Sequence, residues 1–315
     1  MKCLVTGAAG FVGSSLCDRL LSDGHKVVGI DCFVDYYPRA VKMTNLESAR
    51  NSKNFEFIEG HLLNIDLESL LGDCDYVYHQ AAQAGVRASW GKSFEGYTEH
   101  NISATQRLLE GAKGKRNLKK IVYASSSSVY GNAERYPTSE QIVPQPISPY
   151  GVTKLAGEHL MTLYAKAYGV PTVSLRYFTV YGPRQRPDMA FNRFIKAGLA
   201  GEPIAIYGDG TQSRDFTYID DCLAANILAA EKGGAGEVYN IGGGSQVELN
   251  QVLKILSDEL GRLNIKYCER QLGDAMHTGS DSSKARTELG FSPKVGLKEG
   301  LRAEIDWLKR SAADA

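Results

Sequence analysis

The segment from Ser148 to Tyr168 carries two side chains that together could transfer a proton. Tyr150 and Lys154 stand four residues apart in a predicted helix that Ser148 can cap and Gly169 can end, so both lie on one face. A phenol is a poor base at neutral pH, because its ordinary pKa is about 10. A nearby ammonium group stabilises the phenolate, so the pair indicates a tyrosine general base. In isolation, such a pair more often lies on a protein surface.

A run of four hydroxyl side chains changes that balance. Ser125 to Ser128 directly follow the apolar segment Lys120 to Ala124, which is typical of a buried strand. Ligands of open parallel α/β sheets bind at the carboxyl ends of the strands. A serine there could hydrogen-bond a reacting oxygen and pass its proton to Tyr150. A polar loop is the alternative, and it is less natural directly after a buried strand.

A glycine-rich turn follows the first predicted strand. Gly7 to Gly13 read GAAGFVG and open a predicted helix from Ser14 to Leu21. Glycines allow a sharp turn and close approach to a pyrophosphate, which the helix N-terminus stabilises. Asp31 ends the second strand, where its carboxylate can accept hydrogen bonds from the adenosine ribose and would repel a 2′-phosphate. The combination favours NAD over NADP; a βα turn that uses glycine only for packing is the alternative.

The elements that position these residues alternate between short apolar runs and longer amphipathic stretches. Apolar strands separated by helix-length segments predict an α/β fold with a doubly wound parallel sheet of the Rossmann type. The predicted strands are Cys3 to Thr6, Lys26 to Ile30, Phe55 to Ile58, Tyr76 to His79, Lys120 to Ala124 and Thr172 to Leu175.

After Arg176 the sequence becomes richer in loops, with several prolines and the turn cluster Tyr207 to Thr211. We predict a smaller C-terminal α/β substrate lobe here. Because Phe216 to Ile241 combine a helical middle with a strand-like end, this stretch is expected to rejoin the sheet. The predicted NAD-binding domain is therefore 1–176 with 216–241, and the predicted substrate lobe is 177–215 with 242–315.

Composition restricts the class of partner and the compartment. The 315 residues contain 36 Lys and Arg against 36 Asp and Glu, so no net charge favours binding to nucleic acid or an anionic membrane. Neither a signal peptide nor an apolar run of membrane-spanning length is recognisable. The six cysteines show no CxxC pair, which argues against a disulfide framework or a zinc site. We expect a cytoplasmic enzyme with a small-molecule substrate and no metal.

The glycine turn, the serine run and the Tyr150–Lys154 pair, in this order, resemble those of the extended short-chain dehydrogenase/reductases. The resemblance extends over nearly the whole chain, because Arg214 to Asp221 (RDFTYIDD) and Asp281 to Ala285 (DSSKA) also look like that family's second half. Three further segments resemble the UDP-glucuronate 4-epimerases. They are Asp31 to Tyr37 (DCFVDYY), His79 to Arg87 (HQAAQAGVR) and Phe178 to Ala190 (FTVYGPRQRPDMA).

The resemblance implies a role for individual residues. The catalytic residues would be Ser126, Tyr150 and Lys154, with Ser127 and Ser128 as rivals of Ser126. The cofactor NAD would be held by Gly7, Gly10, Phe11, Val12, Gly13, Asp31, Ala81, Ala82, Tyr150 and Lys154. The UDP-sugar would be bound by Arg87, Ser127, Ser128, Thr179, Arg186, Arg193, Arg214 and Asp274. For Arg87 and Arg186 a purely structural role in their loops is the alternative. His61 departs from the family, which usually has Asp there, facing adenine.

The implied reaction is NAD-dependent 4-epimerisation of UDP-glucuronate to UDP-galacturonate through a 4-keto intermediate. Thr179 stands where the family's galactose epimerases usually have Asn, and Ser128 where its decarboxylases usually have Glu. Epimerisation of UDP-glucose or an N-acetylated sugar ranks second, and decarboxylation of UDP-glucuronate third. An NAD-binding sensor or scaffold is the non-enzymatic alternative. The resemblance also implies a homodimer through the helices around Phe94 to Ala112 and Pro149 to Tyr168.

Overall fold

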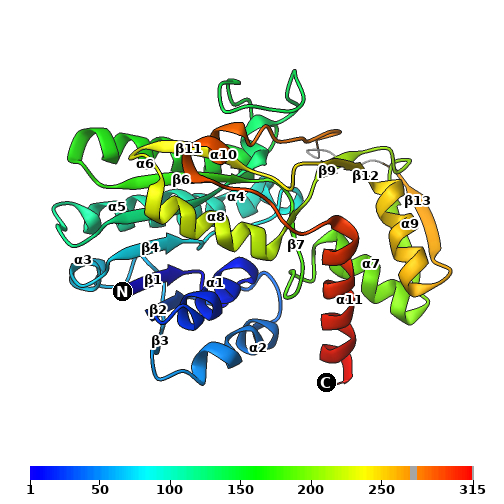
Figure 1. Cartoon of the computed structure of the whole chain (residues 1–315), viewed down its shortest axis with the longest axis horizontal. Coiled ribbons are helices and arrows are strands. Elements are labelled where there is room, and N and C mark those ends of the chain that lie inside the picture. Colours follow the sequence, from blue (N-terminus) through cyan, green and yellow to red (C-terminus); the bar gives the residue numbers. More distant parts are fainter. Residues whose placement is uncertain (270–274, 314–315) are drawn as a thin grey trace.

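A computed structural model of the chain describes residues 1–269 and 275–313. Within this part, a parallel sheet of seven strands has the order β11-β6-β5-β4-β1-β2-β3 (Figure 1). The strands are β1 Lys2–Thr6, β2 Lys26–Asp31, β3 Phe55–Glu59, β4 Tyr76–His79, β5 Lys120–Ser126, β6 Thr172–Tyr177 and β11 Glu237–Ile241. The six predicted strands are present, and β11 joins the sheet beside β6.

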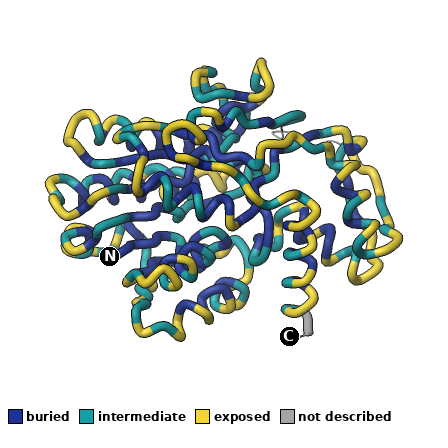
Figure 2. The backbone as a smooth tube through the Cα atoms, in the orientation of Figure 1, coloured by how far each residue is buried: buried dark blue, intermediate teal, exposed yellow. Residues whose placement is uncertain are grey.

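Helices cover both faces of this sheet. Successive strand residues point to opposite sides, and apolar side chains on both sides need to be buried. Leu4 of β1 belongs to one apolar cluster, whereas its neighbours Cys3 and Val5 belong to the other. The first face packs against α3 Leu67–Gly72, α5 Ala104–Ala112 and α6 Pro149–Tyr168, and the second against α1 Phe11–Ser22, α2 Arg39–Arg50 and α8 Ile219–Lys232. The predicted doubly wound α/β fold is confirmed, with buried strands between more exposed helices (Figure 2).

A second group of elements lies beyond the carboxyl ends of the strands (Figure 1). It contains three two-stranded sheets, in which β7 pairs with β10, β8 with β13 and β9 with β12. Their bounds are β7 Val180–Tyr181, β8 Pro203–Tyr207, β9 Ser213–Asp215, β10 Thr217–Tyr218, β12 Gln246–Glu248 and β13 Asn264–Cys268. Its helices are α7 Ala190–Ala200, α9 Leu249–Leu260 and α11 Leu297–Ala313, whereas α10 Ser283–Leu289 packs against α8 and β11 beside the large sheet.

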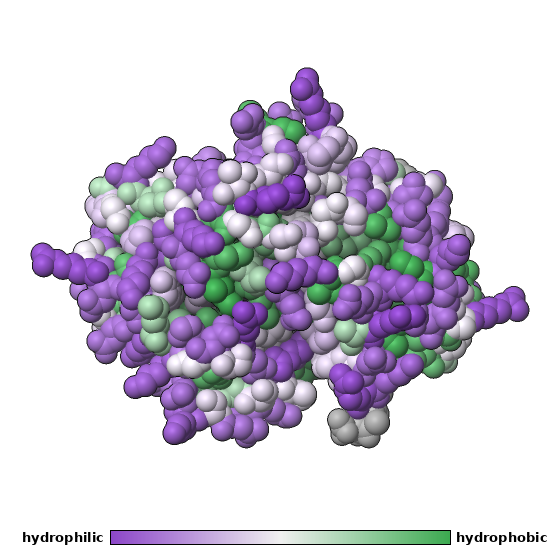
Figure 3. Space-filling view, in the orientation of Figure 1, coloured by the Kyte–Doolittle hydropathy of each residue, from purple (hydrophilic) through white to green (hydrophobic). Residues whose placement is uncertain are grey.

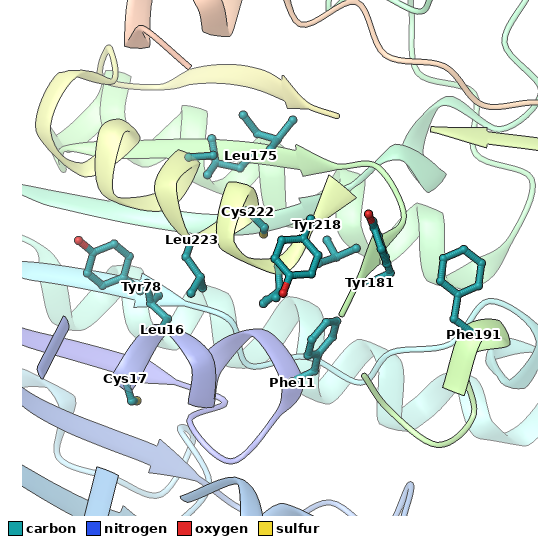
Figure 4. Packing of buried hydrophobic residues seen from close by; sticks show 14 of the residues in the cluster. Phe11, Leu16, Cys17, Tyr78, Leu175, Tyr181, Phe191, Tyr218, Cys222 and Leu223 are labelled. Atoms are coloured by element: carbon teal, nitrogen blue, oxygen red, sulfur yellow. The ribbon is translucent and has the colours of Figure 1, made fainter. Parts of the chain in front are cut away.

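One apolar cluster joins this lobe to the sheet. Leu16 of α1 and Leu175 of β6 belong to the same cluster as Tyr181 and Phe191 of the lobe (Figure 4). The rings of Tyr181 and Phe191 meet edge to face, with centroids 5.4 Å apart. The two parts therefore share a continuous core, which fixes the lobe against the edge of the sheet where the ligand-binding residues were predicted.

Hydrophilic side chains dominate the surface of the face drawn in Figure 3, with smaller apolar areas between them. No helix in the described residues is both long enough and apolar enough to span a bilayer. The short helices before α5 are 3₁₀ turns Arg87–Ser89 and Gly91–Ser93, α4 Phe94–Tyr97 and a π-helical turn η3 Thr98–Ser103. The 3₁₀ turn η4 Ser127–Tyr130 continues β5.

Candidate functional site

The cofactor cavity is a hollow at the carboxyl ends of β1, β2, β4 and β5. Its lining contains every residue predicted to hold the dinucleotide: Gly7, Gly10, Phe11, Val12, Gly13, Asp31, Ala81, Ala82, Tyr150 and Lys154. Gly7 adopts a φ of +69°, and a Cβ there would stand 2.7 Å from the Ala81 nitrogen. A Cβ on Gly13 would stand 2.1 Å from the Gly7 oxygen. Only glycine fits at these two positions, and the resulting cradle suits a pyrophosphate at the start of α1.

Asp31 lies at the end of β2 and is held by the backbone on both sides. Its Oδ2 accepts a hydrogen bond from the Ala9 nitrogen at 3.0 Å, and its Oδ1 accepts one from the Phe33 nitrogen at 2.8 Å. Each carboxylate oxygen has two lone pairs, so each can still accept a hydroxyl. This geometry fits the predicted ribose contact.

Lys42 on α2 is a cation in the cofactor cavity that the sequence reasoning missed. It is buried, and its Nζ donates to the Val34 carbonyl at 2.6 Å. Burial lowers its pKa, while the nearby Asp31 carboxylate acts in the opposite direction. Lys42 lies far from the glycine turn in the sequence, so no local pattern indicated that it would reach this cavity.

His61, the departure from the family pattern, lies with His100 and Cys32 in the lining of the same cavity. The ligand atoms of these three side chains are within 4.8 Å of one another, as a metal site would require. However, the Leu63 nitrogen donates to His61 Nδ1 at 3.1 Å, which leaves the proton of neutral His61 on Nε2. His61 Nε2 then donates to His100 Nδ1 at 2.9 Å. Because the proton occupies the nitrogen that would bind the metal, this cluster is better suited to a hydrogen-bonded pair.

Helix α6 positions Tyr150 and Lys154 close to the serine run. Ser148 caps the helix by accepting a hydrogen bond from the Gly151 nitrogen at 3.1 Å, as predicted. A Cβ on Gly151 would stand 2.5 Å from the Ser128 oxygen, and one on Gly157 would stand 2.1 Å from the Tyr123 hydroxyl. The two glycines therefore allow α6 to lie directly against β5 and η4.

The two side chains respond oppositely to burial. Burial raises the pKa of Tyr150, and both the positive charge of Arg186 and a hydrogen bond with Ser126 oppose that rise. Burial lowers the pKa of Lys154 to about 7, and its Nζ donates to the Ala124 carbonyl at 2.8 Å. From the sequence, Lys154 is the side chain expected to supply the stabilising positive charge. In the structure, Arg186 also supplies one, from the other lobe.

A second hollow, the lobe cavity, lies between the loop after β4 and the lobe, with a volume of about 530 Å³. This size is within the usual range for small-molecule sites. Its lining includes five of the predicted substrate residues: Arg87, Thr179, Arg186, Arg193 and Arg214. Four guanidinium groups around one hollow suit an anionic ligand such as a diphosphate or a carboxylate.

Arg186 lines both cavities and is fixed by Asp188 and Tyr36. Its Nε and Nη2 donate to the two oxygens of Asp188, each at 3.0 Å, and the Tyr36 hydroxyl donates to Asp188 Oδ2 at 3.2 Å. Tyr36 and Asp188 were not predicted as site residues. Both belong to segments that carried the family resemblance, and this was the only signal for them.

The structure does not bring every predicted residue to a cavity wall. Ser126 contacts Ser128, with 3.1 Å between the two hydroxyl oxygens, but Ser126, Ser127 and Ser128 are absent from the described lining of both hollows. Ser125 lines the cofactor cavity instead. Asp274, predicted to contact UDP, lies outside the described residues. The roles of these residues remain predictions.

Comparison with known proteins gives relatives over the full length of the chain. The NAD dependent epimerase/dehydratase family matches residues 3–242. The chain is 47% identical to "Uncharacterized UDP-glucose epimerase YtcB" of Bacillus subtilis, over 98% of both proteins. It is 39% identical to a UDP-glucuronate 4-epimerase of Thermodesulfobacterium geofontis, over 98% of this chain and 96% of that protein. A crystal structure of UDP-glucuronic acid 4-epimerase from Bacillus cereus with UDP-glucuronic acid and NAD superimposes with a TM-score of 0.95. That protein is 49% identical, and the match covers 99% of this chain and 100% of that one.

These matches confirm the resemblance inferred from the motifs, the enzyme class and NAD as the cofactor. They also confirm a nucleotide sugar as the class of substrate. The names of the relatives give different sugars, so they do not identify the sugar of this chain.

Proposed function

Because the chain belongs to the NAD dependent epimerase/dehydratase family, we propose that it converts UDP-glucuronate to UDP-galacturonate through a 4-keto intermediate. The observation that carries this proposal is the position of Arg186. It lines the cavity that holds Tyr150 and also the arginine-rich lobe cavity. An anionic sugar that reaches Tyr150 would therefore meet the half-buried guanidinium of Arg186, which Asp188 holds in place.

The proton transfer depends on Tyr150. Its phenolate would remove the O4 proton of the sugar, and Ser126 would share a hydrogen bond with the same oxygen. Arg186, whose charge lowers the pKa of Tyr150, would stabilise the negative charge of the phenolate, and Lys154, one helical turn further along α6, would add to this effect. The glycine cradle would hold NAD, which supplies the hydride acceptor and donor for C4; the 4-keto sugar would turn over in the site between the two transfers, so that the hydride returns to its other face.

The carboxylate of glucuronate requires its own binding site. The 4-keto intermediate is a β-keto acid, which loses carbon dioxide unless the carboxylate is held in an unfavourable orientation for cleavage. Thr179 lines the lobe cavity together with Arg186. We propose that Thr179, Arg186, Ser127 and Ser128 hold the carboxylate, while Arg87, Arg193, Arg214 and Asp274 bind the UDP moiety.

UDP-glucose or an N-acetylated UDP-sugar is the second candidate substrate, favoured by the name of the Bacillus subtilis relative. A neutral sugar offers no anionic group to the arginines of the lobe cavity, whereas glucuronate offers a carboxylate, and Arg186 therefore favours glucuronate. Decarboxylation to a UDP-pentose ranks third, because Ser128 stands in place of the Glu that decarboxylases of the family usually have. A sensor or scaffold without catalysis would not need the Tyr150–Lys154 pair.

Incubation with UDP-glucuronate, without added reductant, and NMR of the products tests the proposal. We expect UDP-galacturonate in equilibrium with the starting sugar. A UDP-pentose as the main product would assign the decarboxylase reaction instead. Unchanged UDP-glucuronate, with turnover of UDP-glucose in a parallel sample, would assign the second candidate.

We further propose a cytoplasmic homodimer. All six cysteines are free, including the exposed Cys268, which is compatible with a reducing compartment. Helices α4 and α6 pack together and expose Phe94, Val152 and Leu163, apolar side chains that a second copy could cover. Light scattering after gel filtration is expected to give a dimer mass for the wild type and a smaller mass for Val152→Asp/Leu163→Asp.

A further inference from the structure

A buried ion pair lies one helical turn beyond Lys154. Glu158 of α6 and Arg176 of β6 are 3% and 5% exposed. Arg176 Nε donates to Glu158 Oε1 at 2.9 Å, and Nη2 donates to Oε2 at 2.7 Å. This two-point contact fixes the carboxylate in one orientation, because the guanidinium is planar and rigid.

The pair is connected to the strand that holds the catalytic residues. The Ser125 hydroxyl donates to Glu158 Oε1, and Ser125 follows Ala124, whose carbonyl accepts from Lys154 Nζ at 2.8 Å. Glu158 therefore fixes the same short stretch of β5 that receives the lysine. These hydrogen bonds alone could be purely structural. Whether Glu158 also acts on Lys154 depends on the charges around the lysine.

Several titratable groups surround Lys154 from the elements packed against it: Tyr150 and Glu158 on α6, His79 on β4, Tyr123 on β5 and Arg176 on β6. His79 is neutral, because burial and Lys154 lower its pKa to about 3. Burial also raises the pKa of Tyr123 well above its ordinary value. Within this described group, Glu158 is thus the carboxylate, and Arg176 is its positively charged partner.

We propose that Glu158 is a positioning residue for the reaction: held by Arg176 and Ser125, its carboxylate keeps Lys154 protonated beside Tyr150. This inference rests on the proton transfer proposed above. Glu158 does not contact substrate in this scheme; it acts through the ammonium group that stabilises the phenolate and that would bind the nicotinamide ribose.

The opposing effects on Lys154 support the proposal. Burial lowers the pKa of Lys154 to about 7, and Glu158 is the group that acts against this decrease. Removing the carboxylate would therefore leave most of the lysine uncharged at neutral pH. An opposite charge at close range commonly changes a pKa by about 1–3 units.

NMR titration of protein labelled with ¹³C at lysine Cε tests this without any sugar, so the test stands even if the proposed substrate is wrong. The signal of Lys154 is assigned with Lys154→Met. We expect the midpoint to decrease by about 1–3 pH units in Glu158→Gln. Glu110→Gln on α5, which removes a partly exposed carboxylate, is the matched control and is expected to leave the midpoint unchanged.

The double variant Glu158→Gln/Arg176→Gln separates the charge from the structural role. It removes both members of the ion pair and leaves no unpaired buried guanidinium. We expect it to be more stable than Glu158→Gln and to have a midpoint between those of Glu158→Gln and the wild type, because the positive charge of Arg176 is removed as well. The alkaline decline of kcat should move to lower pH in Glu158→Gln and less far in the double variant. A midpoint of Glu158→Gln equal to that of the wild type would overturn the proposal.

Discussion

The cofactor cavity and the lobe cavity share Tyr36 and Arg186 but are built differently. Backbone shapes part of the first, because a Cβ on Gly7 or Gly13 would overlap main-chain atoms. The second is lined by long side chains from loops and from α7. A backbone cradle recognises a constant group such as a pyrophosphate, whereas a wall of side chains can change from one sugar to another. With the sugar bound in the lobe cavity as proposed, this difference accounts for relatives that are named for different sugars.

Tyr150 gives the largest expected effect, because both cavities contribute to its environment. Tyr150→Phe removes the acidic hydroxyl and keeps the ring, whose centroid lies 6.3 Å from that of Tyr97. We expect kcat to fall by about 10²–10⁴-fold, with NAD affinity nearly unchanged. Product NMR and calorimetric titration with NAD provide the measurements. Tyr168→Phe at the exposed end of α6 is the control; equal activity of Tyr150→Phe and wild type would remove Tyr150 from the mechanism.

Gly13→Ala tests the claim that backbone shapes the cofactor cavity. The added Cβ would stand 2.1 Å from the Gly7 oxygen, so the turn must move. Overpacking of this kind typically costs about 1–3 kcal/mol, and we expect NAD affinity to fall by roughly tenfold or more. Gly72→Ala, where a Cβ meets nothing within 4 Å, is the matched control. Unchanged NAD affinity in Gly13→Ala would mean that the turn is not a close-fitting cradle.

Asp31→Asn tests whether a side-chain charge in the cofactor cavity selects NAD over NADP. We expect NAD affinity to fall by roughly tenfold, because a hydrogen bond to a charged group contributes about 1.5–3 kcal/mol. The preference for NAD over NADP should narrow, since repulsion of the 2′-phosphate is lost. Titrations with both cofactors measure this, and thermal unfolding checks the Ala9 and Phe33 contacts. An unchanged NAD/NADP ratio would assign the selectivity to another group.

Arg193→Ala tests the side-chain wall of the lobe cavity. We expect KM for the UDP-sugar to rise by about 5–20-fold with a small change in kcat, because a phosphate contact is made in both ground and transition states. Lys196→Ala, also on the surface of α7 but outside the described cavity lining, is the control. An equal effect of the two variants would indicate general electrostatics and not a specific contact.

Glu304 of α11 gives the smallest expected effect on activity and concerns stability. Its Oε2 accepts from the Gly182 nitrogen at 2.9 Å, next to β7, and burial raises its pKa to about 8. The folded protein therefore binds a proton that the unfolded chain releases above its ordinary pKa of 4.5. Stability from this group is full below pH 4.5 and decreases as pH rises towards 8. We expect Glu304→Gln to flatten the decrease of Tm between pH 6 and 8; parallel curves for variant and wild type would contradict this.

Local sequence patterns predicted most of the fold and the lining of the cofactor cavity. The glycine turn, the caps of α6 and the four-residue spacing of Tyr150 and Lys154 depend on neighbours in sequence, and the structure contains each, although α1 begins at Phe11 and not at Ser14 as predicted. The sequence of β11 is recognisable as a strand from its β-branched residues. Its place beside β6 became known only from the tertiary structure.

The sequence by itself determined the class of fold and the cofactor and predicted Tyr150 as the general base, because glycine turns, helical spacing and apolar runs act over a few residues. The tertiary structure decided which charges reach that base. Arg186 acts on Tyr150 from the other lobe, Tyr36 contacts Asp188 across 152 residues, and Glu158 meets Arg176 on a neighbouring strand. Electrostatic effects depend on distance in space and on burial, which no local pattern encodes.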